Sequence, residues 1–206
     1  MKILIDNGHG INTPGKGSPY ALNNVKPSLY IREWEYCRDI AKEIVKELKL
    51  KGYDAILLVP EPIDVPLRER CRRANMYYQF DKDTVVVSIH LNASGTGVKW
   101  MSANGWSVYT SKGITKSDAL AEKLIDAAVK TFKGKKIRMY QNAHLSKDFE
   151  ENFTILTGTS CPAVLTENFF QDNIEDVKYL LSEEGKKEVV RCHVDGIINY
   201  IKDTIK

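Results

Sequence analysis

Two spacings of hydrophobic residues alternate along the chain. Short runs of adjacent apolar residues are typical of buried strands, whereas apolar residues that recur every three or four positions are typical of amphipathic helices. The runs predict strands over 2–7, 53–59, 84–92, 106–111, 153–156 and 163–170. The longer spacing predicts helices over 32–51, 64–78, 115–132, 173–181 and 184–202. This alternation predicts an α/β fold, with one sheet covered by helices on both faces.

Cap signals mark the ends of several predicted helices. Thr115 with Asp118 fits a capping box, and Gly52 is a typical residue after a helix end. Asp64 followed by Pro66 has the order of a cap residue and a first-turn proline. Residues 8–30 are rich in Gly, Pro and Asn without an apolar period, which predicts a long loop. Loops of this length are usually functional.

The length and composition indicate an ordinary globular chain. It has 206 residues, of which 43% are hydrophobic and 28% are charged. A chain of this size is expected to form one domain over residues 1–206. The composition excludes a disordered chain, a collagen-like fibre and a long coiled coil. The four cysteines contain no CxxC pair and are expected to be small buried apolar residues.

Charge and hydropathy limit the expected partners. The net charge of +3 is too small to indicate nucleic acid as a partner. No apolar run approaches the roughly 20 residues that a membrane-spanning helix needs. The N-terminal MKILIDNGHG lacks the apolar stretch of a secretory signal, so we expect either no export by that route or earlier processing.

Two histidines and a glutamate are candidates for a zinc site. His9 follows the first strand, His90 lies near the end of the central strand, and Glu33 opens the first helix. Residues beyond the carboxyl ends of parallel strands converge on one crevice, and two imidazoles with one carboxylate can bind zinc while one position stays open for water. Taken singly, they could instead be a surface histidine, a packed core histidine and a helix-start carboxylate. Glu35 is the alternative to Glu33.

A second carboxylate could complete the chemistry. Glu167 ends an apolar strand and is expected to point into the same crevice. Beside a zinc-bound water it could accept a proton and then donate it to a leaving amine. The alternative is a solvated glutamate at a strand end.

Five segments follow one another along the chain, and four of them contain these candidate residues. The segments are IDNGHG, the glutamate of the first long helix, LRERCRRAN, SIHLNAS and PAVLTENFFQDN. Together they resemble the zinc-dependent N-acetylmuramoyl-L-alanine amidases of the Amidase_3 family, over nearly the whole chain. Phe169 departs from this pattern because the family usually has glycine there, and the change is expected to reshape the wall near Glu167.

The resemblance implies a fold, a reaction and roles for four residues. The fold would be one α/β domain with a mixed, twisted sheet of about six strands. Zinc would be bound by His9, Glu33 and His90, and Glu167 would be the general base and acid. The substrate would be peptidoglycan, cut at the amide between the lactyl group of N-acetylmuramic acid and the first L-alanine of the stem peptide.

Other residues are expected to have structural roles. His144 is expected on a surface loop and His193 in the core. The arginines among residues 68–73 are expected on a solvated helix face, with contact to an anionic cell wall as the alternative. Core or rim packing is expected for three aromatic residues, with a sugar-binding groove as the alternative. These are Trp100, Trp106 and Tyr109.

Two other functions fit the same residues. One is a cell-wall binding module without catalysis, and the other is a carboxypeptidase-like zinc peptidase. The setting stays equally open between a phage-type lysin released through a membrane pore, a processed exported enzyme and a recycling enzyme.

Overall fold

One mixed sheet organises the computed structural model, which describes residues 1–19, 29–140 and 146–204. Its strands are β1 (Lys2–Asn7), β2 (Asp54–Leu57), β3 (Thr84–Asn92), β4 (Ser107–Thr110), β5 (Phe149–Glu150) and β6 (Ala163–Phe170). They lie in the order β2-β1-β3-β6-β4-β5. β4 runs antiparallel to β6, and the other neighbouring strands are parallel. The expected mixed sheet of about six strands is confirmed.

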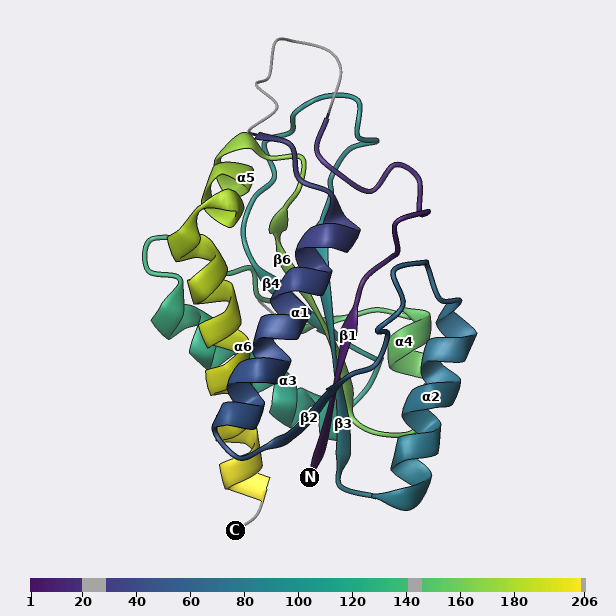
Figure 1. Cartoon of the computed structure of the whole chain (residues 1–206). Coiled ribbons are helices and arrows are strands. Elements are labelled where there is room, and N and C mark those ends of the chain that lie inside the picture. Colours follow the sequence, from purple (N-terminus) through teal and green to yellow (C-terminus); the bar gives the residue numbers. More distant parts are fainter. Residues whose placement is uncertain (20–28, 141–145, 205–206) are drawn as a thin grey trace.

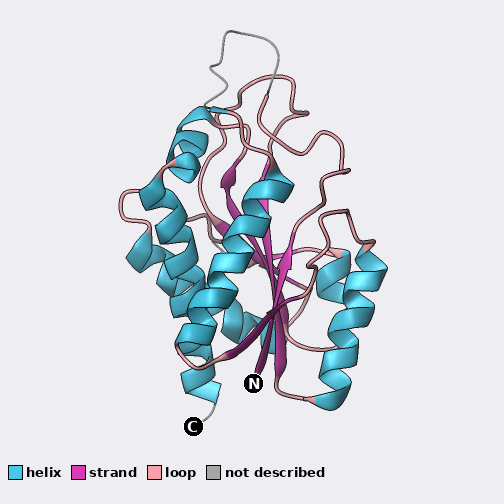
Figure 2. Ribbon diagram, viewed as in Figure 1, coloured by secondary structure: helices cyan, strands magenta, loops and turns pink. Residues whose placement is uncertain are grey.

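Helices cover both faces of this sheet (Figures 1 and 2). One face carries α1 (Glu33–Leu50), α3 (Lys116–Thr131), α5 (Ile174–Leu181) and α6 (Glu183–Thr204). The other face carries α2 (Leu67–Phe80) and the short α4 (Thr154–Thr157). Among the described helices, none combines the length and the apolar character needed to cross a bilayer.

The central strand β3 divides the apolar core into two layers. Val85, Val87 and Ile89 belong to the larger cluster beneath α1, α3 and α6, whereas Val86 belongs to the cluster beneath α2 and α4. Both faces of β3 are therefore buried, which explains why its apolar run is continuous rather than alternating. A shift of one residue would exchange the two faces, so packing fixes the register of this strand.

Two of the three predicted cap signals are confirmed. Thr115 accepts from the Ser117 amide at 3.1 Å, and Asp118 accepts from the Thr115 amide at 2.9 Å, which completes the capping box of α3. Gly52 follows α1 with a positive φ, the left-handed conformation of a helix end. The cap role expected for Asp64 is wrong, because Pro66 occupies the N-cap position of α2 and Asp64 binds other partners.

The segment 153–156 was expected to be a strand, and this prediction is wrong. It contributes to α4, whose Ile155 and Leu156 are buried in the same cluster as residues of α2. A segment of four residues with three apolar side chains is too short to display a period, so it fits either a strand or one helical turn. The two-residue strand β5 was not predicted, because it is too short to leave a pattern.

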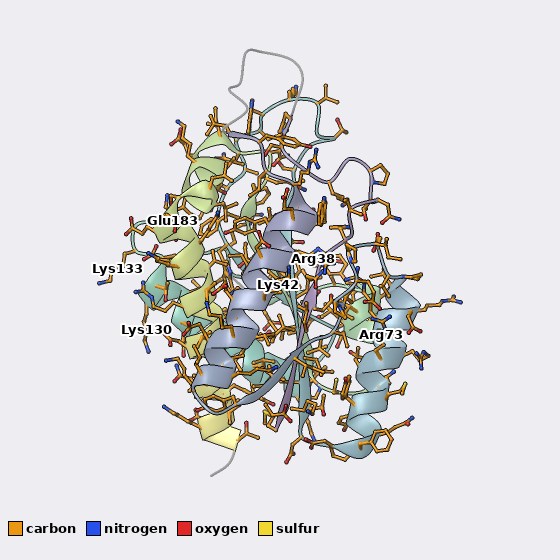
Figure 3. All side chains as sticks on the ribbon, in the orientation of Figure 1. Arg38, Lys42, Arg73, Lys130, Lys133 and Glu183 are labelled. Carbon is orange, nitrogen blue, oxygen red and sulfur yellow. The ribbon has the colours of Figure 1, made fainter. Side chains whose placement is uncertain are left out.

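Two arginines hold the segment that follows β2. Figure 3 labels Arg38 on α1 and Arg73 on α2. Arg38 donates to the backbone carbonyls of Val59, Pro60 and Glu61, and Arg73 pairs with the Glu61 carboxylate at 2.6 Å. These bonds connect helices on opposite faces of the sheet through the chain that leads to Asp64.

His193 is a packed core histidine, as predicted. It is fully buried in α6, and its ring nitrogens lie 2.7 Å from the Val189 carbonyl and 2.9 Å from Thr166 Oγ1. Burial disfavours the charged imidazolium and lowers the pKa of His193 to about 4, although the Val189 carbonyl opposes this shift. The four cysteines are also buried and free, as expected.

The lowered pKa of His193 predicts a loss of stability in acid. The unfolded histidine binds a proton near pH 6.5, whereas the folded one does so only near pH 4. The buried neutral imidazole therefore contributes fully to the free energy of unfolding above pH 6.5, and this contribution is lost as the pH falls toward 4. The loss is on the order of 3 kcal/mol. Urea unfolding between pH 7 and 4 should therefore show a shallower pH dependence for His193→Gln than for the wild-type chain. Equal slopes would contradict this prediction.

Candidate metal centre

The candidate site lies at the carboxyl edge of the parallel strands, in the upper half of Figure 1, where α1 also begins. β1 and β3 pair in parallel with Asn7 opposite Ile89. His9 follows Asn7 by two residues and His90 follows Ile89 by one, so both imidazoles reach the same level. Glu33, the first residue of α1, donates its backbone N–H to the Lys16 carbonyl at 3.2 Å. The three residues predicted from the sequence are thus brought together.

The three side chains surround a point at which a metal ion could bind. Glu33 Oε1 lies 3.3 Å from His9 Nε2 and 3.1 Å from His90 Nδ1, and one ligand atom from each residue lies within 4.8 Å of the others. Two atoms bound to one tetrahedral zinc ion at about 2 Å are roughly 3.3 Å apart. The separations from Glu33 Oε1 match this spacing. Glu35 is exposed, so Glu33 is the carboxylate at the site.

The electrostatics of Glu33 favour a carboxylate that carries its charge. Its side chain is only 2% exposed, and burial raises its pKa. The hydrogen bonds to His9 and His90 outweigh burial, so the pKa of Glu33 lies below its ordinary value. Burial lowers the pKa of His90, but Glu33 more than compensates and the pKa of His90 is raised. A buried negative charge between two imidazoles is an environment that attracts a cation.

Gly8 is required by the close approach of β1 to β3. Its N–H donates to the Ile89 carbonyl at 2.9 Å, and a Cβ atom at this position would lie 2.5 Å from the His90 ring. A side chain here would therefore displace His90. The next residue, His9, has a φ of 62°. This left-handed conformation is uncommon outside glycine and must be held by its surroundings.

Arg70 holds the backbone of the loop that carries His9. Its guanidinium donates to the carbonyls of Asn7 and His9 and pairs with Asp6 at 2.8 Å and Asp64 at 3.0 Å. The side chain is only 1% exposed. The solvated helix face expected for all four arginines is therefore wrong for Arg70.

Glu167 lies directly opposite His90 in the pairing of β3 with β6. Its Oε2 is buried and has no hydrogen-bond partner among the described residues. Burial raises the pKa of Glu167 to about 8, with the negative Glu33 adding to the shift and His90 opposing it. Glu167 is partly exposed as a residue but its Oε2 is covered, so it is not the fully solvated glutamate of the alternative interpretation.

Phe169 adopts a left-handed backbone with a φ of 68°. Glycine adopts this conformation without strain, which explains a preference for glycine at this position. The pairing of β3 with β6 shifts register here, as expected for a bulge. The Phe169 ring is fully buried, and its centroid lies 5.1 Å from those of Phe132 and Tyr179. The ring packs into the core, so the expectation that it reshapes the wall near Glu167 is wrong.

The remaining sequence predictions concern aromatic residues and one histidine. Trp106 is fully buried and donates to Asn168 Oδ1 at 2.9 Å, which confirms core packing. Trp100 packs against the larger core cluster, and Tyr109 stacks on Phe149. His144 lies outside the described residues.

One residue of the site has no role predicted from the sequence. Gln171 follows β6, and its side-chain amide donates to Glu33 Oε2 at 3.0 Å. It belongs to the segment PAVLTENFFQDN, but a glutamine after an apolar strand carries no signal of such a contact. The contact arises from the packing of distant segments.

Comparison with known proteins identifies a family over most of the chain. Residues 3–199 match a family model described as N-acetylmuramoyl-L-alanine amidase. An endolysin of Bacillus phage SPP1 is 30% identical over 203 residues, which cover 95% of this chain and 64% of the endolysin. The N-acetylmuramoyl-L-alanine amidase AmiC of Neisseria meningitidis is 23% identical, covering 98% of this chain and 53% of AmiC. The chain thus spans less than two thirds of either relative.

Solved structures share the fold. An N-acetylmuramoyl-L-alanine amidase from Clostridium difficile 630 superposes with a TM-score of 0.75 at 23% identity, covering 98% of this chain and 96% of that one. The catalytic domain of CwlV, from Bacillus (Paenibacillus) polymyxa, has the same TM-score and identity and covers 98% of each chain.

Removal of the Arg70 guanidinium should strongly destabilise the fold. Arg70→Met leaves the buried Asp6 carboxylate without its partner, which costs about 3–5 kcal/mol of unfolding free energy. Arg72→Met is the matched control, because the Arg72 side chain is 60% exposed on the same helix. Loss of an exposed side chain changes the unfolding free energy by about 0.5 kcal/mol or less. Chemical denaturation measures both changes, and similar values for the two variants would contradict the role of Arg70.

Proposed function

The chain belongs to the N-acetylmuramoyl-L-alanine amidase family, and from this membership we propose that it hydrolyses the amide between N-acetylmuramic acid and L-alanine in peptidoglycan. The observation that carries the proposal is the convergence of His9, Glu33 and His90 beside Glu167. We further propose that residues 1–206 act as one catalytic domain. Its action would be on the cell wall, as the names of the phage endolysin and AmiC suggest for those relatives.

We propose zinc as the metal. Two histidine nitrogens and one carboxylate oxygen are a recognised catalytic donor set for zinc, and the separations from Glu33 Oε1 suit it. When bound, zinc supplies a Lewis acid that polarises a carbonyl group and makes water more acidic. His9, Glu33 and His90 would hold the ion.

The role proposed for Glu167 is proton transfer. Glu167 pairs with His90 across β3 and β6, its Oε2 is buried, and in the metal-free protein burial raises its pKa to about 8, close to neutral. A group with a pKa near the working pH both accepts and donates protons efficiently. Glu167 would accept a proton from the attacking water and then transfer it to the departing alanine nitrogen.

Replacement of Glu167 should separate catalysis from metal binding. Glu167→Gln keeps the size of the side chain but removes the base, so we expect a loss of about 100- to 10,000-fold in turnover with metal content unchanged. Turnover is measured as the release of stem peptides with a free L-alanine amino group from purified peptidoglycan. Wild-type turnover in Glu167→Gln would reject the proposed role.

The same assay distinguishes the other candidate functions. A carboxypeptidase would release single amino acids from the peptide C-terminus, and a binding module would retain cell wall without releasing any product. A wild-type protein that gives either result would overturn the amidase proposal.

The neighbouring glutamates of α1 provide a matched test of the metal site. Glu33→Ala should lose the ion, because the carboxylate between the imidazoles is removed, whereas the exposed Glu35→Ala should keep about one zinc ion per chain. Metal analysis of the two purified proteins, with circular dichroism as a check of folding, measures this difference. Equal zinc contents would contradict the assignment of Glu33.

A further inference from the structure

We propose that Gln171 is a positioning residue that controls how Glu33 faces the metal ion. Its amide would hold one carboxylate oxygen away from the site, so that Glu33 offers the ion a single oxygen. This inference rests on the proposed function, because it takes the proposed zinc site as its starting point. None of the five segments that resemble the family suggests this role.

The two oxygens of Glu33 have different partners. Oε1 lies near His9 Nε2 and His90 Nδ1 and also accepts from the Leu91 amide at 3.1 Å. Oε2 accepts from Gln171 Nε2 at 3.0 Å. Since an ionised carboxylate only accepts hydrogen bonds, the NH₂ end of Gln171 must be the end that faces it. Gln171 therefore fixes the rotation of the carboxylate about its own axis.

The burial of Gln171 argues against a role in packing alone. The residue is only 2% exposed, and its Oε1 is buried without a hydrogen-bond partner among the described residues. An unpaired buried carbonyl is unfavourable, and a methionine of similar size would fill the space without it. The contact that distinguishes glutamine from methionine here is the donation to Glu33.

Both ends of this contact are held by regular structure. The Gln171 backbone N–H donates to the Asn92 carbonyl at 2.8 Å, which ties the residue to the end of β3. Glu33 is anchored by the start of α1 and by its backbone bond to Lys16. A hydrogen bond between two anchored residues can fix a ligand with little conformational freedom.

Loss of the Gln171 donor should weaken metal binding and change its geometry. Without a partner for Oε2, the Glu33 carboxylate can rotate and present both oxygens to the ion. Loss of a partner that orients a metal ligand typically lowers metal affinity about 10- to 100-fold. A second carboxylate oxygen would also raise the number of ligands around the ion.

The test compares two glutamine-to-methionine variants of the metal-free protein. Gln171→Met removes the donor, and Gln79→Met makes the same change on α2, away from the site. Competition between each protein and a chromophoric chelator for zinc gives the dissociation constant. We expect about 10- to 100-fold weaker binding for Gln171→Met and wild-type binding for Gln79→Met.

Cobalt(II) substitution supplies a second readout that a purely structural role would not move. Tetrahedral cobalt absorbs visible light more strongly than cobalt with additional ligands, so the absorption of Gln171→Met should be weaker than that of the wild type at full loading. Wild-type zinc affinity together with a wild-type cobalt spectrum in Gln171→Met would overturn the proposal. An equal loss of affinity in Gln79→Met would overturn it as well.

Two controls keep the result interpretable. If Gln171→Met does not fold, as judged by circular dichroism, Gln171→Asn becomes the deciding variant, because its shorter amide does not reach Glu33. The same loss of zinc affinity is expected for Gln171→Asn.

Failure of the amidase proposal has a different signature. A wild-type protein that binds zinc but releases no stem peptides rejects the proposed reaction and leaves the role of Gln171 standing, whereas wild-type protein that binds no zinc rejects both.

Discussion

The site depends on the compensation of a buried negative charge. Glu33 is almost entirely removed from solvent, and a carboxylate in that position is stable only if hydrogen-bond donors or cations surround it. The two imidazoles and the Leu91 amide meet one of its oxygens, and Gln171 meets the other. The same surroundings that keep the carboxylate charged also make it a candidate ligand for a metal ion.

A second buried charge network supports the site from the other face of the sheet. Arg70 pairs with Asp6 and Asp64 and binds the backbone around His9, while Asp6 also accepts from Ser88 of β3. The loop after β1 is thereby tied to α2 and to the central strand. This explains how His9 can keep a left-handed backbone conformation next to His90.

The end of β6 assigns neighbouring residues to different tasks. Glu167 lies opposite His90, the bulge at Phe169 sends a ring into the core, and Gln171 reaches Glu33. A regular strand would alternate its side chains between the two faces of the sheet. The bulge breaks that alternation, so one short stretch of chain supplies a candidate proton carrier, a core anchor and a partner for the candidate metal ligand Glu33.

The sequence by itself determined the α/β class, most of the strands and helices, and the grouping of His9, Glu33, His90 and Glu167 at one edge. These features follow from local apolar patterns and from the rule that parallel strand ends converge. Local patterns left Glu33 and Glu35 as alternatives, and they misassigned α4 because a short apolar run has no measurable period.

Only the tertiary structure decided which glutamate faces the imidazoles, that Arg70 is buried, and that Gln171 touches Glu33. Each of these depends on contacts between segments far apart in the chain: Arg70 lies 64 residues from Asp6, and Gln171 lies 138 residues from Glu33. Residue type and spacing carry no record of such contacts, because they are fixed by how the helices pack on the sheet.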